Sequence, residues 1–290
     1  MHTTKSIKDI GDTLISNKYL NFYKVMKYPI PQNMECFFFE KKNNTNTRFK
    51  EDCWFSRNKK NKYMDEYIEF INKYWNLYKS IPFIKEIYLC NSISFNSLKK
   101  DSDIDLFIIT QKNSIRRARF FSLLFFSILW IRRWKEVRKK FCLSFYVTED
   151  NQNLYNISIP RSDIYLNYWL AHLITLYQEK GNSWNIYKHN NRFRSSLPNH
   201  PQKFCINIGN KKYYWNSKLK NILQKSLWWL LWNIIEYIIK IIWIPILKSK
   251  TKKLWKKWQW VIISDQMLKF YHDKRFQIHL MYEINAKTNR

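Results

Sequence analysis

The clearest pattern of hydrophobic and polar positions lies in the middle of the chain. Residues 63–80 repeat apolar side chains every three to four positions, which predicts a helix that Pro82 ends. A basic-flanked apolar stretch predicts a second helix over 114–140. Three short apolar runs predict strands at 85–90, 104–110 and 141–147. The resulting order of helix, strand, turn, strand, helix and strand is typical of a compact α/β unit.

The segments on either side of this unit are less regular. Their patterns predict helices at 5–28, 163–180 and 217–247, a polar loop region at 181–215, and a strand followed by a helix within 261–285. We therefore divide the chain into an N-terminal helical segment with a basic loop (1–62), a central domain (63–150) and a mainly helical C-terminal region (151–290).

The composition restricts the classes of protein to consider. Hydrophobic residues make up 46% of the 290 positions, which excludes a disordered chain. The five cysteines are scattered and form no C-x-x-C pair, so neither a zinc site nor a disulfide framework is expected. The N-terminal residues lack the long apolar core of a signal peptide. A reducing cytoplasm is therefore the expected compartment.

The net charge has two explanations. A formal charge of +29 predicts an anionic partner, such as nucleic acid, nucleotide phosphates or an anionic membrane surface. The chain is also rich in Lys, Asn, Ile, Phe and Tyr, which are all read from AT-rich codons. Mutational bias then accounts for much of the lysine excess without any partner. The sequence alone leaves both explanations open.

Two apolar stretches were considered as membrane segments. Residues 120–131 are too few to span a bilayer, and residues 228–247 contain Asn233, Glu236 and Lys240, which are costly at bilayer depth. We therefore expect no transmembrane span. The basic, tryptophan-containing segment that follows residue 247 suits lipid headgroups or nucleic acid, so peripheral attachment to a membrane remains an alternative.

Two aspartates stand out within the strand predicted near residues 104–110. Side chains alternate along a strand, so Asp103 and Asp105 are expected on the same side, with Cα atoms about 6.5–7 Å apart, while their aliphatic neighbours enter the core. Two adjacent carboxylates repel each other unless a cation lies between them. Oxygen ligands of this kind suit Mg²⁺ or Mn²⁺, which also bind substrate phosphates.

A phosphate-binding turn is predicted at the end of the preceding strand. Ser92 follows that strand, and its hydroxyl and the next backbone N–H groups are placed to hold a phosphate. Ser102 is either a second nucleotide-binding hydroxyl or a group that bonds the turn backbone. Three basic residues open the helix after the aspartates and either neutralise a triphosphate or form a solvated helix end; they are Arg116, Arg117 and Arg119.

This combination resembles the nucleotidyltransferase superfamily of the DNA polymerase beta type. The family signature is Gly-Ser, a spacer and Asp-x-Asp, and here it is matched by Asn91, Ser92, Asp103 and Asp105. Longer segments, including KSIPFIKEIYLCNS, KKDSDIDLFIIT and FCLSFYVTEDNQNL, are similar to uncharacterised bacterial members. The resemblance implies an α+β fold with a small mixed sheet and flanking helices. It also implies transfer of a nucleoside monophosphate from an NTP, with the aspartates holding Mg²⁺ or Mn²⁺ and Ser92 touching the triphosphate. The acceptor is RNA, another protein or a small molecule.

Two departures from the family pattern keep an alternative open. Asn91 replaces the usual glycine, although Asn tolerates the left-handed conformation best among other residues. Active members place a third carboxylate on the following strand, where alternation here puts Ser144, while Glu149 and Asp150 lie at the strand end. The alternative is a catalytically degenerate protein of the same fold that binds RNA or an anionic membrane surface.

Overall fold

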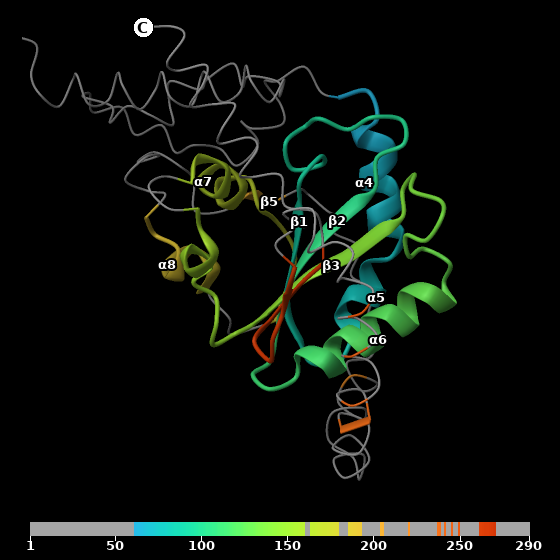
Figure 1. Cartoon of the computed structure of the whole chain (residues 1–290). Coiled ribbons are helices and arrows are strands. Elements are labelled where there is room, and N and C mark those ends of the chain that lie inside the picture. Colours follow the sequence, from blue (N-terminus) through green and yellow to red (C-terminus); the bar gives the residue numbers. More distant parts are fainter. Residues whose placement is uncertain are drawn as a thin grey trace, which may run out of the picture.

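The computed structural model describes residues 61–159, 163–179, 185–192, 204–205 and 261–270, together with Lys220 and isolated helical positions between 237 and 249 (Figure 1). The helix predicted at 5–28 lies outside the described residues, as does almost all of the N-terminal segment 1–62. The helix predicted at 217–247 is described only at single positions.

A mixed sheet organises the described residues. Its seven strands are β1 (Ile84–Cys90), β2 (Ile104–Thr110), β3 (Phe141–Thr148), β4 (Ile174–Gln178), β5 (Phe204–Cys205), β6 (Ile262–Ile263) and β7 (Met267–Lys269). Within these residues the order is β5-β4-β1-β2-β3-β7-β6. The pairs β2–β3 and β4–β5 are parallel and the others antiparallel. The prediction of an α+β protein with a mixed sheet is therefore confirmed.

Helices lie on both sides of this sheet (Figure 1). They are α4 (Met64–Lys73), α5 (Trp75–Ser80), α6 (Ile115–Ile128), η1 (Leu154–Ile157), α7 (Ile164–Ala171) and α8 (Asn185–His189). The first three share one core with one face of the sheet, and α7 and α8 share a second core with the other face. Among the described residues, none of the helices combines the length and the apolar character needed to cross a membrane.

The helix predicted over 114–140 is wrong in its second half. α6 ends at Ile128, and Trp130 adopts a positive φ of 54° that turns the chain back. The Ile131 backbone N–H then donates to Phe126, and its carbonyl accepts from Phe141, so residues 129–140 form a loop that leads into β3. Because of this turn, Ile131 enters the core, where it is 3% exposed, and the basic residues that follow reach solvent.

The helix predicted over 163–180 is also too long. α7 ends at Ala171, and Ile174–Gln178 forms strand β4 beside β1. Apolar residues would occur on every side of a helix drawn over 163–180. The sequence pattern therefore does not distinguish a helix from a strand in this segment. The loop region 181–215 contains α8 and β5, and 261–270 forms the β6–β7 hairpin. Four strands thus come from beyond residue 150, and the boundary drawn there runs through one sheet.

An aromatic cluster joins the helices to the sheet. Phe141, at the start of β3, is fully buried and has its ring centroid 5.1 Å from that of Phe126 and 5.8 Å from that of Phe70. Tyr74 and Tyr78 contact the same ring from α4 and α5. Phe141 therefore ties three helices to the central strands, and its loss would leave a large cavity.

The Phe141→Ala substitution is expected to lower the free energy of unfolding by about 3–5 kcal/mol, the usual cost of truncating a buried phenylalanine. Urea denaturation followed by circular dichroism measures this. The matched control is Phe120→Ala on α6, where the ring is 39% exposed, and its expected cost is below about 1 kcal/mol. Equal effects of the two substitutions would contradict the assignment of Phe141 to the core.

Candidate metal centre

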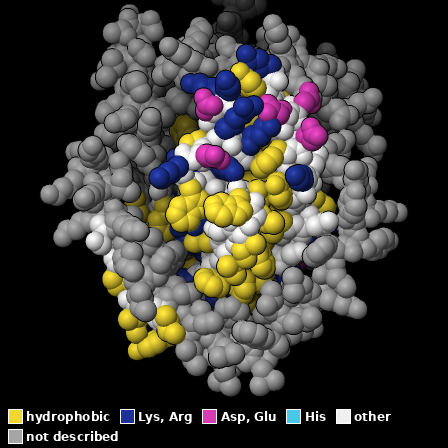
Figure 2. Space-filling model, turned by 90° about the vertical axis from the view of Figure 1, so that its right-hand side faces the viewer, with side chains coloured by type: hydrophobic (Ala, Val, Ile, Leu, Met, Phe, Trp, Pro, Cys, Tyr) yellow, Lys and Arg dark blue, Asp and Glu magenta, His cyan; other side chains and the backbone are white. Residues whose placement is uncertain are grey.

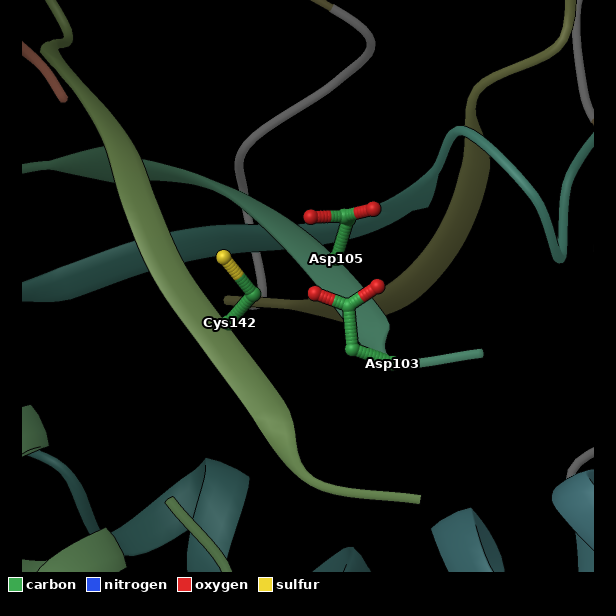
Figure 3. A group of neighbouring side chains, drawn as sticks. All are labelled: Asp103, Asp105 and Cys142. Carbon is green, nitrogen blue, oxygen red and sulfur yellow. The ribbon is translucent and has the colours of Figure 1, made fainter. Parts of the chain in front are cut away.

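Three side chains that can bind a metal converge where β2 and β3 begin. Asp103 immediately precedes β2, Asp105 lies in it, and Cys142 lies opposite Asp105 in the parallel β2–β3 register. One ligand atom from each lies within 4.8 Å of the others (Figure 3). Among the described residues, this is the one group of three or more such side chains. The aspartates were predicted to face the same way, whereas Cys142 was not predicted.

The alternation along β2 explains how carboxylates fit an apolar strand. One set of side chains enters the core beneath α4, α5 and α6, and the other enters the core beneath α7 and α8. The first set is Ile104, Leu106 and Ile108, and the second is Phe107 and Ile109. Asp105 belongs to the second set by position, but it lies at the end of the strand, where that core gives way to the turn after β1.

Asn91 occupies this turn in the conformation expected of a glycine substitute. It follows β1, whose last residue pairs with Asp105, and its φ of 58° is left-handed. Its side-chain oxygen accepts a hydrogen bond of 3.0 Å from the indole N–H of Trp169. The same side chain also hydrogen-bonds Asp105. Asn91 therefore links α7 to the carboxylate, which glycine has no side chain to do.

Ser92 contributes a buried hydroxyl. Its oxygen has no hydrogen-bond partner among the residues that the structure describes, which is costly unless a ligand supplies one. The Phe95 N–H makes the first backbone hydrogen bond of the following turn, to Asn91, so the N–H groups of residues 92–94 precede the bonded turn. Ser102 is different: its hydroxyl accepts from the Lys99 N–H at 2.8 Å and so holds the turn backbone.

The electrostatics of the pair differ from those of free carboxylates. Burial, together with the neighbouring Asp103 carboxylate, raises the pKa of Asp105 to about 6. Hydrogen bonds from Asn91 and Cys142 and the charge of Arg133 oppose this rise. Burial also raises the pKa of the Cys142 thiol to about 12, with Asp105 adding to the effect. Near neutral pH the thiol is therefore protonated unless a metal displaces its proton.

Arg133 places a positive charge directly on this cluster. Its guanidinium donates to the Asp103 carboxylate at 2.5 Å and lies 3.8 Å from the Cys142 sulfur. The Asp103 side chain is 17% exposed, whereas that of Arg133 is 45% exposed and has room to move. Sequence reasoning placed Arg133 at the end of a helix and missed this contact, because the contact depends on the return of loop 129–140 to β3.

Among the described residues, no third carboxylate joins the two aspartates, as the sequence had led us to ask. Glu149 follows β3 at the opposite end of the sheet, where its N–H donates to Thr110 and its carboxylate accepts from the Lys112 N–H. That end is about 20 Å from Asp105 by the strand rise. In the β2–β3 register Cys142 lies opposite Asp105. Ser144, the position to which alternation pointed, lies on the same face, with its hydroxyl 3.3 Å from the Cys142 sulfur.

The arginines at the start of α6 serve the fold instead of a phosphate. α6 begins after the end of β2 that is remote from Asp105. Arg116 forms an ion pair with Asp265. Arg119 is buried, lies 3.9 Å from the ring centroid of Phe270 and donates to the Leu143 carbonyl. Both therefore fasten the β6–β7 hairpin to α6, and neither is a solvated helix end.

No protein-family model, curated protein or solved structure matches this chain. The donor atoms of the site define the cations that it suits. Asp103 and Asp105 supply oxygen ligands of the kind that Mg²⁺ and Mn²⁺ prefer. The sulfur of Cys142 adds a ligand that suits softer cations such as Zn²⁺. The cluster as a whole fits a divalent cation, and the state of Cys142 and Arg133 determines which one.

The raised pKa of Asp105 predicts a specific pH dependence of stability. Folding favours its protonated form, so the stability contributed by this group is present below its ordinary pKa and is lost as the pH rises through about 6. In the absence of divalent cations, the loss amounts to as much as about 3 kcal/mol. Asp105→Asn is expected to remove it. Urea denaturation of both proteins at about pH 3.5 and pH 8 tests this, and identical pH dependence would contradict it.

Removal of Arg133 is expected to favour metal binding. Arg133→Gln takes away a cation that competes for Asp103, so the affinity for Mn²⁺ should rise by about two- to five-fold, the range typical of exposed ion pairs. Calorimetric titration measures the change. Arg138→Gln is the matched control, because Arg138 lies in the same loop but pairs with Glu66. An equal change in both variants would show that only net charge matters.

Proposed function

We propose that this chain is a metal-dependent nucleotidyltransferase of the DNA polymerase beta type, which transfers a nucleoside monophosphate from an NTP to an acceptor hydroxyl. One observation carries the proposal. The register of β1 and β2 brings the Asn91–Ser92 turn next to Asp105 and, with it, Asp103. A turn suited to phosphate and a pair of carboxylates suited to a cation are thus adjacent, which is what handling of a metal-bound triphosphate requires.

Each residue has a chemical role in this proposal. Asp103 and Asp105 would hold Mg²⁺ or Mn²⁺, which supplies charge for the triphosphate. The Ser92 hydroxyl, which has no partner among the described residues, and the N–H groups after it would bind phosphate oxygens. Asn91 keeps the turn left-handed and orients Asp105. Ser102 would contribute mainly by fixing the turn before Asp103.

The proposed reaction exchanges one phosphorus–oxygen bond for another. The acceptor oxygen forms a bond to the α-phosphorus, the bond from that phosphorus to the bridging oxygen breaks, and pyrophosphate leaves with the electron pair. The acceptor hydroxyl loses its proton. Among the described residues, no further carboxylate adjoins the pair, and the Cys142 thiol holds its own proton too tightly to act as a base. The proton is therefore assigned to solvent.

A second candidate function is supported by two features of the same site. Arg133 already neutralises Asp103, and Cys142 occupies the place next to Asp105 that a third acid would take. Both features suit a protein that has kept the fold and lost the transfer reaction. That protein would bind RNA or an anionic membrane surface through its basic faces, consistent with its charge of +29.

The test is transfer of label from each α-labelled NTP, in the presence of Mg²⁺ or Mn²⁺, to a cell extract containing RNA, protein and small-molecule acceptors. The double variant Asp103→Asn/Asp105→Asn is expected to reduce transfer by at least about 100-fold, since no other described group binds the cation. The matched control is Asp101→Asn, an exposed acid in the preceding turn, which should leave transfer unchanged.

Two results would contradict the proposal. Label transfer that survives the double substitution would place the chemistry elsewhere. If no NTP gives transfer, and removal of Asp103 and Asp105 leaves binding of Mn²⁺ and NTP unchanged, neither the reaction nor the metal site exists. If no NTP gives transfer but metal–nucleotide binding is lost in the double variant, the second candidate function is favoured.

A further inference from the structure

Helix α6 is apolar on both of its faces. Its inner face packs on the sheet through buried residues such as Ala118, Phe121 and Phe126. Its outer face carries Phe120 and Leu124, which are 39% and 40% exposed, and Ile128, which is 62% exposed. These three follow one another at four-residue intervals and form a stripe along the helix. A surface helix normally has a polar outer face, so this stripe is unusual.

The stripe continues into the loop after the helix. Leu129 is 45% exposed, and the indole rings of Trp130 and Trp134 are 84% and 73% exposed. Figure 2 shows hydrophobic side chains gathered on this side of the molecule, with Lys and Arg side chains next to them. We call the six residues the α6–Trp patch; they are Phe120, Leu124, Ile128, Leu129, Trp130 and Trp134. Exposed apolar groups gathered in this way mark interaction surfaces.

Basic side chains border this patch. Residues 129–140 contain six Lys or Arg residues and a single acid, Glu136. Four of the six basic residues form ion pairs with acids. The guanidinium of Arg132 instead lies 4.9 Å from the centroid of the Trp134 ring, and Lys135 is exposed next to it. Within the described residues, neither Arg132 nor Lys135 has an acidic partner.

We infer that the α6–Trp patch docks on the surface of an anionic lipid bilayer. Phe120, Leu124 and Ile128 would enter the boundary of the acyl chains, with α6 lying in the plane of the membrane. Trp130 and Trp134 would lie at the level of the headgroups, the depth that tryptophan prefers. Arg132 and Lys135 would then face lipid phosphates, which attract cations near the surface.

Charge and chemistry favour a bilayer over other occupants. Nucleic acid could pair with the cations and stack on the tryptophans, but it would leave Leu124, Ile128 and Leu129 in water. A second copy docked on the same patch about a two-fold axis would bring Arg132 and Lys135 of both copies together, and like charges oppose this. An anionic bilayer covers the aliphatic side chains and neutralises the cations at the same time.

Flotation of the full-length protein with vesicles tests this inference. The protein is expected to bind phosphatidylcholine vesicles that contain 30% phosphatidylglycerol, and to bind pure phosphatidylcholine much more weakly. Leu124→Glu/Ile128→Glu should weaken binding by about tenfold or more, since it removes apolar area and adds negative charge. The matched control is Asn191→Glu/Gln266→Glu, which adds the same two negative charges at exposed positions outside the patch and should bind as the unmodified protein does.

A second variant guards against loss of folding. Arg132→Gln/Lys135→Gln changes only side chains outside the core and is expected to weaken binding to the anionic vesicles by about tenfold, with no effect on thermal unfolding. Unchanged vesicle binding in both patch variants would overturn the inference. So would dimerisation, or binding to single-stranded RNA, that the patch variants abolish in a protein that binds neither kind of vesicle. Transfer activity is not needed for either measurement.

Discussion

Repulsion between two adjacent carboxylates is the constraint around which the described site is arranged. Asp103 and Asp105 begin a strand whose other side chains fill two cores, so neither can turn away from the other without disturbing the sheet. Burial adds to the cost of keeping both ionised. The structure meets this cost with Arg133 on Asp103 and with hydrogen bonds from Asn91 and Cys142 to Asp105. These three residues come from three separate segments, which the sheet brings together.

The loop after α6 links the candidate metal centre to the α6–Trp patch. Residues 129–140 leave the helix through the left-handed Trp130, bury Ile131 and return to β3. The same path directs Arg133 to the aspartates and leaves the tryptophans in solvent. A regular helix over this stretch would have carried Arg133 away from β2. The turn at Trp130 therefore determines both the charge balance of the site and the exposure of the apolar patch.

The parts of the fold that could be predicted from the sequence are those governed by local patterns. The three central strands were located to within about one residue, because each is a short apolar run with polar neighbours. The left-handed Asn91 was expected because it replaces the glycine of the family signature, and Asn tolerates that conformation better than other residues do. Strand β4 was missed because an apolar run without periodicity suits a buried helix or a buried strand equally well. Its state is fixed by pairing with β1, a contact distant in sequence.

The incomplete prediction of the site has a comparable physical cause. Counting alternate residues along β3 pointed to Ser144, which does lie on the same face as Cys142. Which of the two lies opposite Asp105 depends on how β3 pairs with β2, and the sequence does not give that register. The contact between Arg133 and Asp103 could be predicted only from the course of the whole loop 129–140. The shared orientation of Asp103 and Asp105 depends on a single strand and could be expected from the sequence, whereas the positions of Cys142 and Arg133 depend on two packed segments and could not.

Charge balance restricts how the site can hold a cation. A divalent ion bound by Asp103 and Asp105 with a neutral Cys142 thiol is balanced only if Arg133 moves away from Asp103. A softer ion that displaces the thiol proton adds one negative charge, so Arg133 can stay. Both arrangements are neutral, which a partly buried site favours. Only the first frees Arg133 to meet the phosphates of a nucleotide. The position of Arg133 therefore distinguishes a site built for a hard cation and a triphosphate from one that simply retains a metal.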